Sequence, residues 1–324
     1  MGTKAEVRDK ALSLGFDDVG FASAEPFQEQ REVLQGRQQE YGWVKELGLD
    51  LEEGTDPSAV LPGAKSIVVL LYNYYRKGFP RWMEGHFGRC YLDDDRVTKD
   101  GMSRLIKSFR EFLTHSGVGT KIPFNLPHRA AATRAGVGTL GRNCLLYANR
   151  VARGSSFVLP IAVVVDQEFE PDTATQEYGC PDWCRKTCVV ACPTKALKGD
   201  GSLDPRKCIS FLTYLGQDMT PMDLREAMGI SIFGCDRCQE VCPRNDPWMA
   251  QDLALNERVA AKEQDFELPK LLSMDSEYFQ ERIWPHMFYI PAEQLWKWKM
   301  NVARAMPLLS SCCSIRSARA SRRR

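Results

Sequence analysis

The chain has 324 residues, of which 44% are hydrophobic, so it is long enough for two domains that each bury a core. Its 43 basic and 42 acidic side chains nearly cancel, which excludes a strong overall field that would attract nucleic acid or an anionic membrane. No run approaches the ~18 apolar residues of a membrane span, and the N-terminal stretch is charged where a secretory signal needs an apolar core, so we expect a cytoplasmic protein without a membrane partner.

The first part of the chain predicts a mixture of helices and strands. Periodicity and turn residues indicate a helix over residues 3–14, a strand over 18–22, a polar helix over 26–47 and a buried strand over 66–71. Further helices are expected over 98–115 and 130–135, followed by an apolar strand over 156–165 in which Pro160 favours an edge or bulge position. This mixture predicts an α/β or α+β domain up to about residue 170.

The C-terminal part predicts helices and then a tail. Residues 247–309 read as helical, and their bulky Trp284, Trp296 and Trp298 are expected to pack against another surface. Residues 310–324 carry five arginines and no acid, which predicts a basic, disordered tail. Cys312 and Cys313 lie in that tail without neighbouring ligands and are left out of any metal site.

Eight of the twelve cysteines form two groups of four, and each group ends in Cys-Pro. Eight thiolates are the ligand count of two 4Fe-4S clusters, and the C-x2-C-x3-C-P spacing of the second group belongs to the bacterial ferredoxin run. In that run the last cysteine ligates the other cluster, because a short loop can wrap only three thiolates around one cube. We therefore predict one cluster on Cys180, Cys184, Cys188 and Cys242, and another on Cys192, Cys208, Cys235 and Cys238.

A structural zinc site is the alternative for these cysteines. The first group has x3 spacings throughout, and residues four apart would share one face of a helix. The paired Cys-Pro endings favour clusters over zinc. Disulfides are disfavoured because cytosolic thiols stay reduced.

A glycine-rich segment offers a second candidate binding site. Glycines let backbone amides approach a phosphate or the edge of a macrocycle, and Arg142 adds a fixed positive charge. A helix is expected before the segment and a strand after it, which is the reverse of the dinucleotide-binding order, and a glycine loop without a ligand is the alternative. The candidate cofactor-binding residues are Arg134, Gly136, Gly138, Gly141, Arg142, Asn143, Ser155 and Ser156.

Six segments together resemble the epoxyqueuosine reductases, cobalamin-dependent iron-sulfur enzymes related to reductive dehalogenases. They are DPSAVLPGAKSIVVL, RAAATRAGVGTLGRNCLL, GSSFVLPIAVV, ACPTKAL, LDPRKCISFLT and IFGCDRCQEVCPRN, in the order of the family. The resemblance implies an α+β fold, with a nitroreductase-like cobalamin-binding domain over 1–170 and a ferredoxin-like domain with two clusters over 171–250. A helical C-terminal segment over 251–309 and the tail would follow.

The same resemblance implies a function. Members of the family reduce the epoxide of epoxyqueuosine in tRNA, so the expected partners are tRNA and an external low-potential donor of ferredoxin or flavodoxin type. The glycine segment would hold the cobalamin. His128 aligns with an acid of the family and would donate a proton, although a histidine that only bonds the backbone after Pro127 has the same sequence. An electron-transfer or corrinoid-reactivating protein and a dehalogenase-like reductase of small molecules remain alternatives.

Two further features depart from the family. The stretch Gly88-Arg89-Cys90-Tyr91-Leu92 replaces Gly-Arg-Asp-Tyr-His, so an acid and a histidine are lost. The helical-repeat domain that assists tRNA binding in longer relatives has no recognisable pattern after residue 250.

Overall fold

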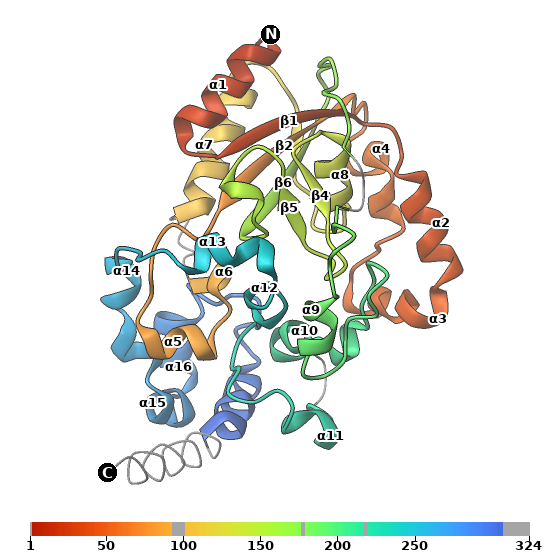
Figure 1. Ribbon diagram of the computed structural model, residues 1–324. Coiled ribbons are helices and arrows are strands. Elements are labelled where there is room, and N and C mark those ends of the chain that lie inside the picture. The colour runs from red at the N-terminus through yellow and green to blue at the C-terminus, as the bar shows by residue number, and fades with distance from the viewer. Residues whose placement is uncertain (1, 93–100, 176–178, 217–218, 307–324) are drawn as a thin grey trace.

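The computed structural model describes residues 2–92, 101–175, 179–216 and 219–306 (Figure 1). The start of the helix expected over 98–115 and the tail over 310–324, with Cys312 and Cys313, lie outside these ranges. None of the helices in the described ranges is long and apolar enough to span a membrane.

An antiparallel four-stranded sheet forms the upper half of the molecule in Figure 1. Its strands, in spatial order, are β1 (Asp18–Ser23), β2 (Ser66–Asn73), β6 (Val158–Val165) and β3 (Thr120–Lys121). A separate hairpin pairs β4 (Gly138–Leu140) with β5 (Leu146–Ala148). The strands expected over 18–22, 66–71 and 156–165 are confirmed.

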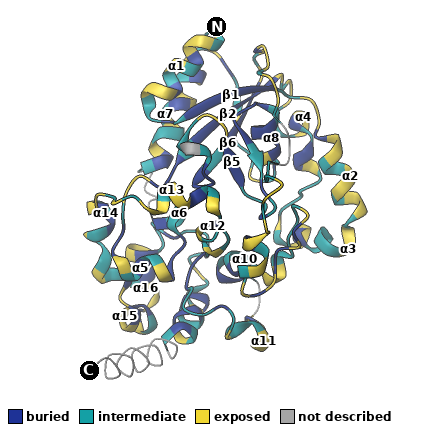
Figure 2. Cartoon of the chain, in the orientation of Figure 1, coloured by how far each residue is buried: buried dark blue, intermediate teal, exposed yellow. Residues whose placement is uncertain are grey.

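Helices cover both faces of the sheet. Successive residues of a strand point to opposite faces, and in the central strands both sets of residues are apolar. Val68 and Leu70 pack with α1 (Lys4–Leu14) and α7 (Gly101–His115) on one face. Ile67 and Val69 pack with α8 (His128–Arg134) and the β4–β5 hairpin on the other. The sheet is therefore buried on both faces, as the dark strands of Figure 2 show.

Pro160 occupies a position that differs from the predicted edge strand. β6 lies between β2 and β3, but β3 pairs only with Val164 and Val165. Backbone N–H groups alternate along a strand, so the missing N–H of Pro160 lies on the same side as that of Ala162. The Ala162 N–H donates to His128 Nδ1 at 2.9 Å, so on that side this part of β6 meets α8 instead of a strand. The proline thus breaks no ladder bond.

The polar helix expected over 26–47 is interrupted. It forms α2 (Gln28–Gly36), α3 (Gln38–Tyr41) and the 3-10 helix η1 (Gly42–Leu47). Neither α2 nor α3 buries a residue, so no apolar stripe holds one continuous helix across Arg37. Other short helices in the first part of the chain are η2 (Glu53–Thr55), α4 (Pro57–Val60) and η3 (Ala152–Gly154).

Short helices make up the lower half of the molecule. Those of the cysteine region are α9 (Thr187–Ala191), η4 (Pro205–Lys207), α10 (Ile209–Tyr214), α11 (Met222–Arg225), α12 (Arg237–Glu240) and η5 (Pro243–Asn245). Those that follow are α13 (Asp246–Met249), α14 (Glu257–Ala260), η6 (Glu263–Phe266), α15 (Leu268–Ser273), α16 (Ser276–Tyr278), the π-helical turn η7 (Phe279–Ile283) and a helix over 295–306.

An apolar core joins these C-terminal helices to a segment from far earlier in the chain. Residues 79–92, with α5 (Arg81–His86) and α6 (Arg89–Leu92), pack into this core instead of against the sheet. Trp298 is fully buried there and stacks on Phe233, with ring centroids 5.4 Å apart. The packing role predicted for Trp298 is confirmed, whereas Trp296 is 42% exposed.

Candidate iron-sulfur and cavity site

The first four cysteines approach one another from a turn and a short helix. Cys180 and Cys184 lie in irregular chain, whereas Cys188 lies within α9. Lys186 has a φ of 54°, which turns the chain just before that helix. The x3 spacing therefore does not create one continuous helical face, which removes the geometric reason for placing a different metal here.

The two Cys-Pro pairs end their segments as their sequence predicts. Cys192 is the C-cap residue of α9, and Pro193 cannot continue the helix. Cys242 is the N-cap residue of η5, with Pro243 at the first helical position. Each of these cysteines thus sits at a corner of the chain and can point away from its own group.

The eight thiols fall into two neighbourhoods, which we call the first and second thiol sets. The first set is Cys180, Cys184, Cys188 and Cys242, and the second set is Cys192, Cys208, Cys235 and Cys238. Burial raises the pKa of Cys188, and the charges of the other three members of the first set add to the rise. Burial also raises the pKa of Cys238, and the nearby charges of Cys235 and Cys208 raise it further. Burial raises the pKa of Cys208 as well, and the charge of Cys192 adds to that rise. The charge of Cys188 also raises the pKa of Cys238, so the two sets lie next to each other.

A single metal ion and a cluster make different demands on the thiols. Within the described ranges, no three His, Cys, Asp or Glu side chains lie close enough to hold one metal ion. Tetrahedral zinc needs its four thiolates to converge at ~2.3 Å on one point, whereas a cube of four irons and four sulfides keeps its ligands farther apart.

Hydrogen-bond donors surround the thiols, as a negatively charged cluster requires. The backbone N–H of Arg142 donates to Cys180 Sγ at 3.2 Å, and that of Ala196 donates to Cys192 Sγ at 3.3 Å. The Tyr147 hydroxyl donates to Cys242 Sγ at 3.1 Å. The donor set and its surroundings therefore fit two 4Fe-4S clusters.

A cavity of about 330 Å³ opens beside the second thiol set. All four members of the second set line it, and no member of the first set does. Val158 and Leu159 of β6 and Tyr214 of α10 contribute to the rest of the wall. A group that fills this cavity would lie next to one thiol set only.

A second cavity of about 570 Å³ adjoins the first. Arg129, Cys144, Leu159 and Pro160 line both, so we describe them together as the joined cavities. The larger one is bordered by Phe124, which is 61% exposed, and therefore reaches the surface. Mostly apolar walls with a few polar groups are typical of cofactor sites.

Only two of the eight candidate cofactor-binding residues line these cavities. Asn143 and Ser156 contribute to the wall beside the second thiol set. The side chains of both are already bonded within the protein: Asn143 Nδ2 donates to the Tyr147 hydroxyl at 3.0 Å, and Ser156 Oγ accepts from Asn245 Nδ2 at 2.9 Å. These internal bonds fix both side chains in the wall.

The three glycines of the segment lie off the cavity walls, and packing within the protein explains them. A Cβ at Gly136, where φ is 71°, would come within 2.4 Å of the Thr173 carbonyl oxygen. One at Gly141 would come within 2.4 Å of the Tyr147 ring, and one at Gly138 within 2.8 Å of Leu146. The requirement for glycine thus comes from the close approach of the β4–β5 hairpin and its neighbours.

The remaining candidates of the segment also lie off the walls. Arg134 donates to the carbonyl of Glu25 at 2.6 Å and stacks over the Phe27 ring. Arg142 acts through its backbone N–H on Cys180, and Ser155 Oγ accepts from the Phe157 N–H at 2.9 Å.

His128 lines the larger cavity, with both ring nitrogens bonded to backbone groups. Nδ1 accepts the Ala162 N–H at 2.9 Å, which leaves the proton on Nε2, where it is donated to the Pro123 carbonyl at 2.7 Å. To act as an acid, the ring would need a second proton on Nδ1, and the Ala162 N–H would lose its acceptor. The geometry favours the backbone-bonding alternative that the sequence left open.

Three residues of the site were not singled out from the sequence for a role in it. Tyr147 bonds a thiol of the first set, Arg129 places a cation between the joined cavities, and Cys144 lines both. Burial raises the pKa of Cys144 to about 11, so its thiol stays protonated, and it donates to the Gly201 carbonyl. Cys90 also lines the smaller cavity. Residue type alone gives no signal for Tyr147, because its contact partner is 95 positions away.

Comparison with known proteins identifies the cysteine region and the fold. Residues 171–245 match the family model of the 4Fe-4S double cluster binding domain. The chain is 34% identical over 256 residues to the epoxyqueuosine reductase of Bacillus cereus, covering 75% of this chain and 64% of that protein, so it spans less than two thirds of that relative. It is 31% identical over 250 residues to the epoxyqueuosine reductase of Cyclobacterium marinum, covering 74% of this chain and 78% of the relative.

Solved structures agree with the sequence matches. The epoxyqueuosine reductase of Bacillus subtilis aligns with a TM-score of 0.71 at 27% identity, over 94% of this chain and 80% of that one. A crystal structure of epoxyqueuosine reductase with an epoxyqueuosine-modified tRNA stem loop aligns with a TM-score of 0.67 at 28% identity, over the same shares. The α+β fold expected from the sequence is confirmed. With its fold and its double-cluster region both matched, the chain belongs to the epoxyqueuosine reductase family.

Proposed function

We propose that this protein is an oxidoreductase that reduces an epoxide, and that its substrate is epoxyqueuosine in tRNA. The observation that carries the proposal is the cavity wall, where all four thiols of the second set face a space large enough for an organic cofactor. The names of the relatives support the reaction, and the stem loop bound by one solved relative supports the substrate class. Two electrons and two protons convert the epoxide to an alkene and water.

Each thiol set would hold one 4Fe-4S cluster, so the last cysteine of each sequence group would serve the other group's cluster. The proximity of Cys242 to Cys188 supports this crossed arrangement. So does the cavity wall, which contains Cys192 together with Cys208, Cys235 and Cys238. Electrons would pass from the first set to the second and then to the joined cavities.

The joined cavities would hold a cobalamin, which supplies a nucleophilic low-valent metal centre when it is bound. Val158, Leu159 and Pro160 give the space an apolar wall that excludes water, and Arg129 offers a cation to polar edges of the cofactor or substrate. Asn143 and Ser156 fix the wall through their internal bonds. His128 remains the candidate proton donor, on the condition that its ring releases the Ala162 N–H.

The proposed domain organisation follows these roles. Residues 1–170 would form the cobalamin-binding domain and residues 171–250 the ferredoxin-like domain, with a helical segment over 251–309. The segment 79–92 belongs to the first range in sequence but packs with the third. A carrier that only passes electrons to a partner would have no use for cavities of this size beside its clusters, so the enzyme is favoured over that alternative.

The test is a turnover assay on anaerobically reconstituted protein with cobalamin, reduced methyl viologen and an epoxyqueuosine-modified anticodon stem loop. Mass spectrometry should show the loss of one oxygen atom from the modified base. Omitting cobalamin, or replacing Cys208 by Ala, should abolish this loss. An unchanged stem loop would contradict the proposal, and reduction of a halogenated aromatic instead would indicate a dehalogenase-like reductase.

A further inference from the structure

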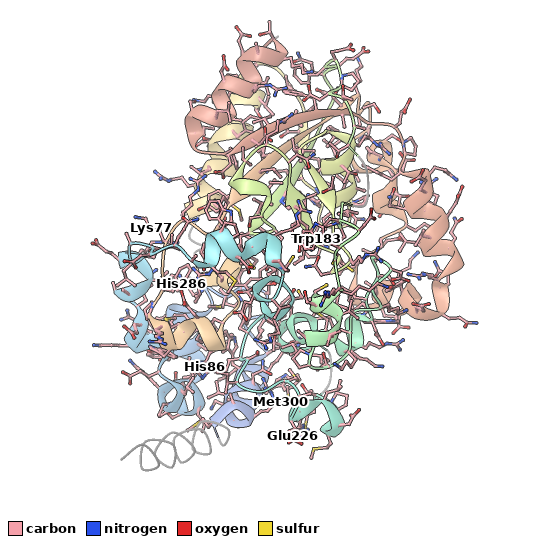
Figure 3. All side chains as sticks on the ribbon, viewed as in Figure 1. Lys77, His86, Trp183, Glu226, His286 and Met300 are labelled. Atoms are coloured by element: carbon pink, nitrogen blue, oxygen red, sulfur yellow. The ribbon has the colours of Figure 1, made fainter. Side chains whose placement is uncertain are left out.

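An exposed surface lies beside the first thiol set, in a part of the chain that the cavities do not use. Trp183, which is labelled in Figure 3, is 63% exposed and directly precedes Cys184. Val190 is 71% exposed and follows Cys188 on α9. Large apolar side chains left exposed beside the same functional thiols are candidates for a binding surface.

Three basic residues lie close in sequence to these two apolar side chains. Arg185 and Lys186 are exposed between Cys184 and α9. Lys195 Nζ bonds to the Val190 carbonyl at 2.8 Å, which holds a third cation at the edge. Asp182 is the one acid of the chain between residues 179 and 199. We call Trp183, Arg185, Lys186, Val190 and Lys195 the Trp183 patch.

The patch lies where electrons would have to enter. The second thiol set faces the joined cavities, so it is the donor to whatever they hold, whereas the first set has no face on them. Trp183 and Arg185 flank Cys184 of the first set in sequence. Under the proposed function each turnover consumes two electrons that the protein does not contain, so an external donor must reach the first set from the surface.

We propose that the Trp183 patch is the docking surface for an acidic one-electron carrier protein that reduces the cluster of the first thiol set. In each encounter one electron leaves the reduced carrier and enters the oxidised cluster, and no covalent bond forms or breaks. Trp183 is the apolar centre of the contact, and Arg185 and Lys186 steer the acidic partner and fix its orientation. The proposal rests on the proposed function, because only a reductase needs repeated delivery of electrons.

RNA is the other polyanion that a basic patch could attract. The substrate must reach the joined cavities, whose opening is bordered by Phe124 and Val33, and none of the patch residues lines those cavities. The centre of the patch is an apolar side chain next to a cysteine of the first thiol set, which suits a protein surface better than a phosphate backbone. These features favour a protein carrier.

The experiment measures reduction of the oxidised clusters by anaerobic stopped-flow, without cobalamin or tRNA. The carrier is a reduced plant-type 2Fe-2S ferredoxin, and reduced methyl viologen serves as a small reductant that needs no docking surface. In the double variant Arg185→Glu/Lys186→Glu, the second-order rate constant with ferredoxin at low salt should fall by about tenfold or more. Its salt dependence should also reverse, because attraction becomes repulsion.

Two further variants separate docking from damage. Trp183→Ala should raise the ferredoxin concentration needed for half-maximal reduction by about tenfold, because a central tryptophan carries much of a binding energy. The control Arg104→Glu/Lys107→Glu reverses two exposed charges on α7, which lies away from α9 in Figure 1, and should leave both rates unchanged. All variants should keep the parent's iron content and its rate with viologen.

Equal ferredoxin rates in the parent and the Arg185→Glu/Lys186→Glu variant would overturn the proposal, and so would an equal loss of viologen reduction, since the cluster itself would then be damaged. Competition by an unmodified tRNA stem loop against ferredoxin would assign the patch to RNA and overturn it too. Because the readout needs neither cobalamin nor substrate, normal ferredoxin docking in a protein that leaves the epoxide intact would contradict the proposed function alone.

Discussion

Replacing Tyr147 by Phe should lower the reduction potential of the cluster on the first thiol set. The hydroxyl donates to Cys242 Sγ at 3.1 Å and accepts from Asn143 Nδ2 at 3.0 Å. Burial keeps the pKa of Tyr147 far above its usual value, so the donor proton is retained at any working pH. A hydrogen bond to a thiolate stabilises the reduced cluster more than the oxidised one, because the reduced cluster carries one more negative charge.

The size of the shift follows from the strength of that bond. A hydrogen bond to a charged group contributes ~1.5–3 kcal/mol, and only part of it differs between the two redox states because both are negative. A difference of roughly 1 kcal/mol corresponds to roughly 40 mV for one electron. Asn143 Nδ2 keeps its second acceptor, the Cys238 carbonyl at 3.3 Å, so the fold should lose only about 1 kcal/mol.

A redox titration followed by electron paramagnetic resonance measures the effect. The first-set cluster of Tyr147→Phe should titrate roughly 40 mV below the parent, with the second-set cluster and the iron content unchanged. Tyr74→Phe is the matched control, since the Tyr74 hydroxyl is buried and bonded to Gln239 but to no thiol. An unchanged first-set potential, or a shift confined to the other cluster, would refute the reasoning.

Three other predictions test separate parts of the account. Cys242→Ala should disrupt the cluster of the first thiol set and Cys192→Ala that of the second, and spectra in which each substitution damaged the cluster of its own sequence group would contradict crossed ligation. If His128 donates the proton, His128→Ala should lower turnover by ~100- to 10,000-fold with iron content unchanged, and His128→Asp should restore part of it. Undiminished turnover would contradict this role and would assign His128 the structural role of accepting the Ala162 N–H. Burial lowers the pKa of His86 below the usual value of 6.5 for a histidine, and its Nε2 has no hydrogen-bond partner among the described residues, so stability should be full above that pH and fall as the pH drops through the folded pKa. Urea unfolding at several pH values should show this loss, and His86→Phe should remove it.

Features that depend on residues close together in the sequence were predictable. The strands around Val68 and Val163 are continuous apolar runs, and the capping box of Thr3 and Glu6 begins α1. The cysteine groups were predictable for the same reason, because ligand spacing and Cys-Pro endings are local patterns. The matched double-cluster domain confirms that reading of the region.

Features that depend on distant contacts were not predictable from one sequence. Phe87 joins Phe233 and Trp298 in one core although it lies within the first 170 residues, and no local pattern separates it from the sheet domain. The glycine segment looked like a ligand loop because the close approach of Thr173 and Tyr147, which excludes a Cβ at Gly136 and Gly141, cannot be seen in sequence. The joined cavities likewise arise only where β6, α8 and the cysteine helices meet.

The central claim is that two clusters deliver electrons to a cobalamin beside the second thiol set. Metal analysis of one anaerobically reconstituted preparation, after removal of free cofactor, tests it most directly. Two clusters and one cobalamin should give about eight irons and about one cobalt per chain, with Cys208→Ala losing about half of the iron. Stoichiometric zinc in a colourless protein, or a full complement of iron with no cobalt retained, would contradict it.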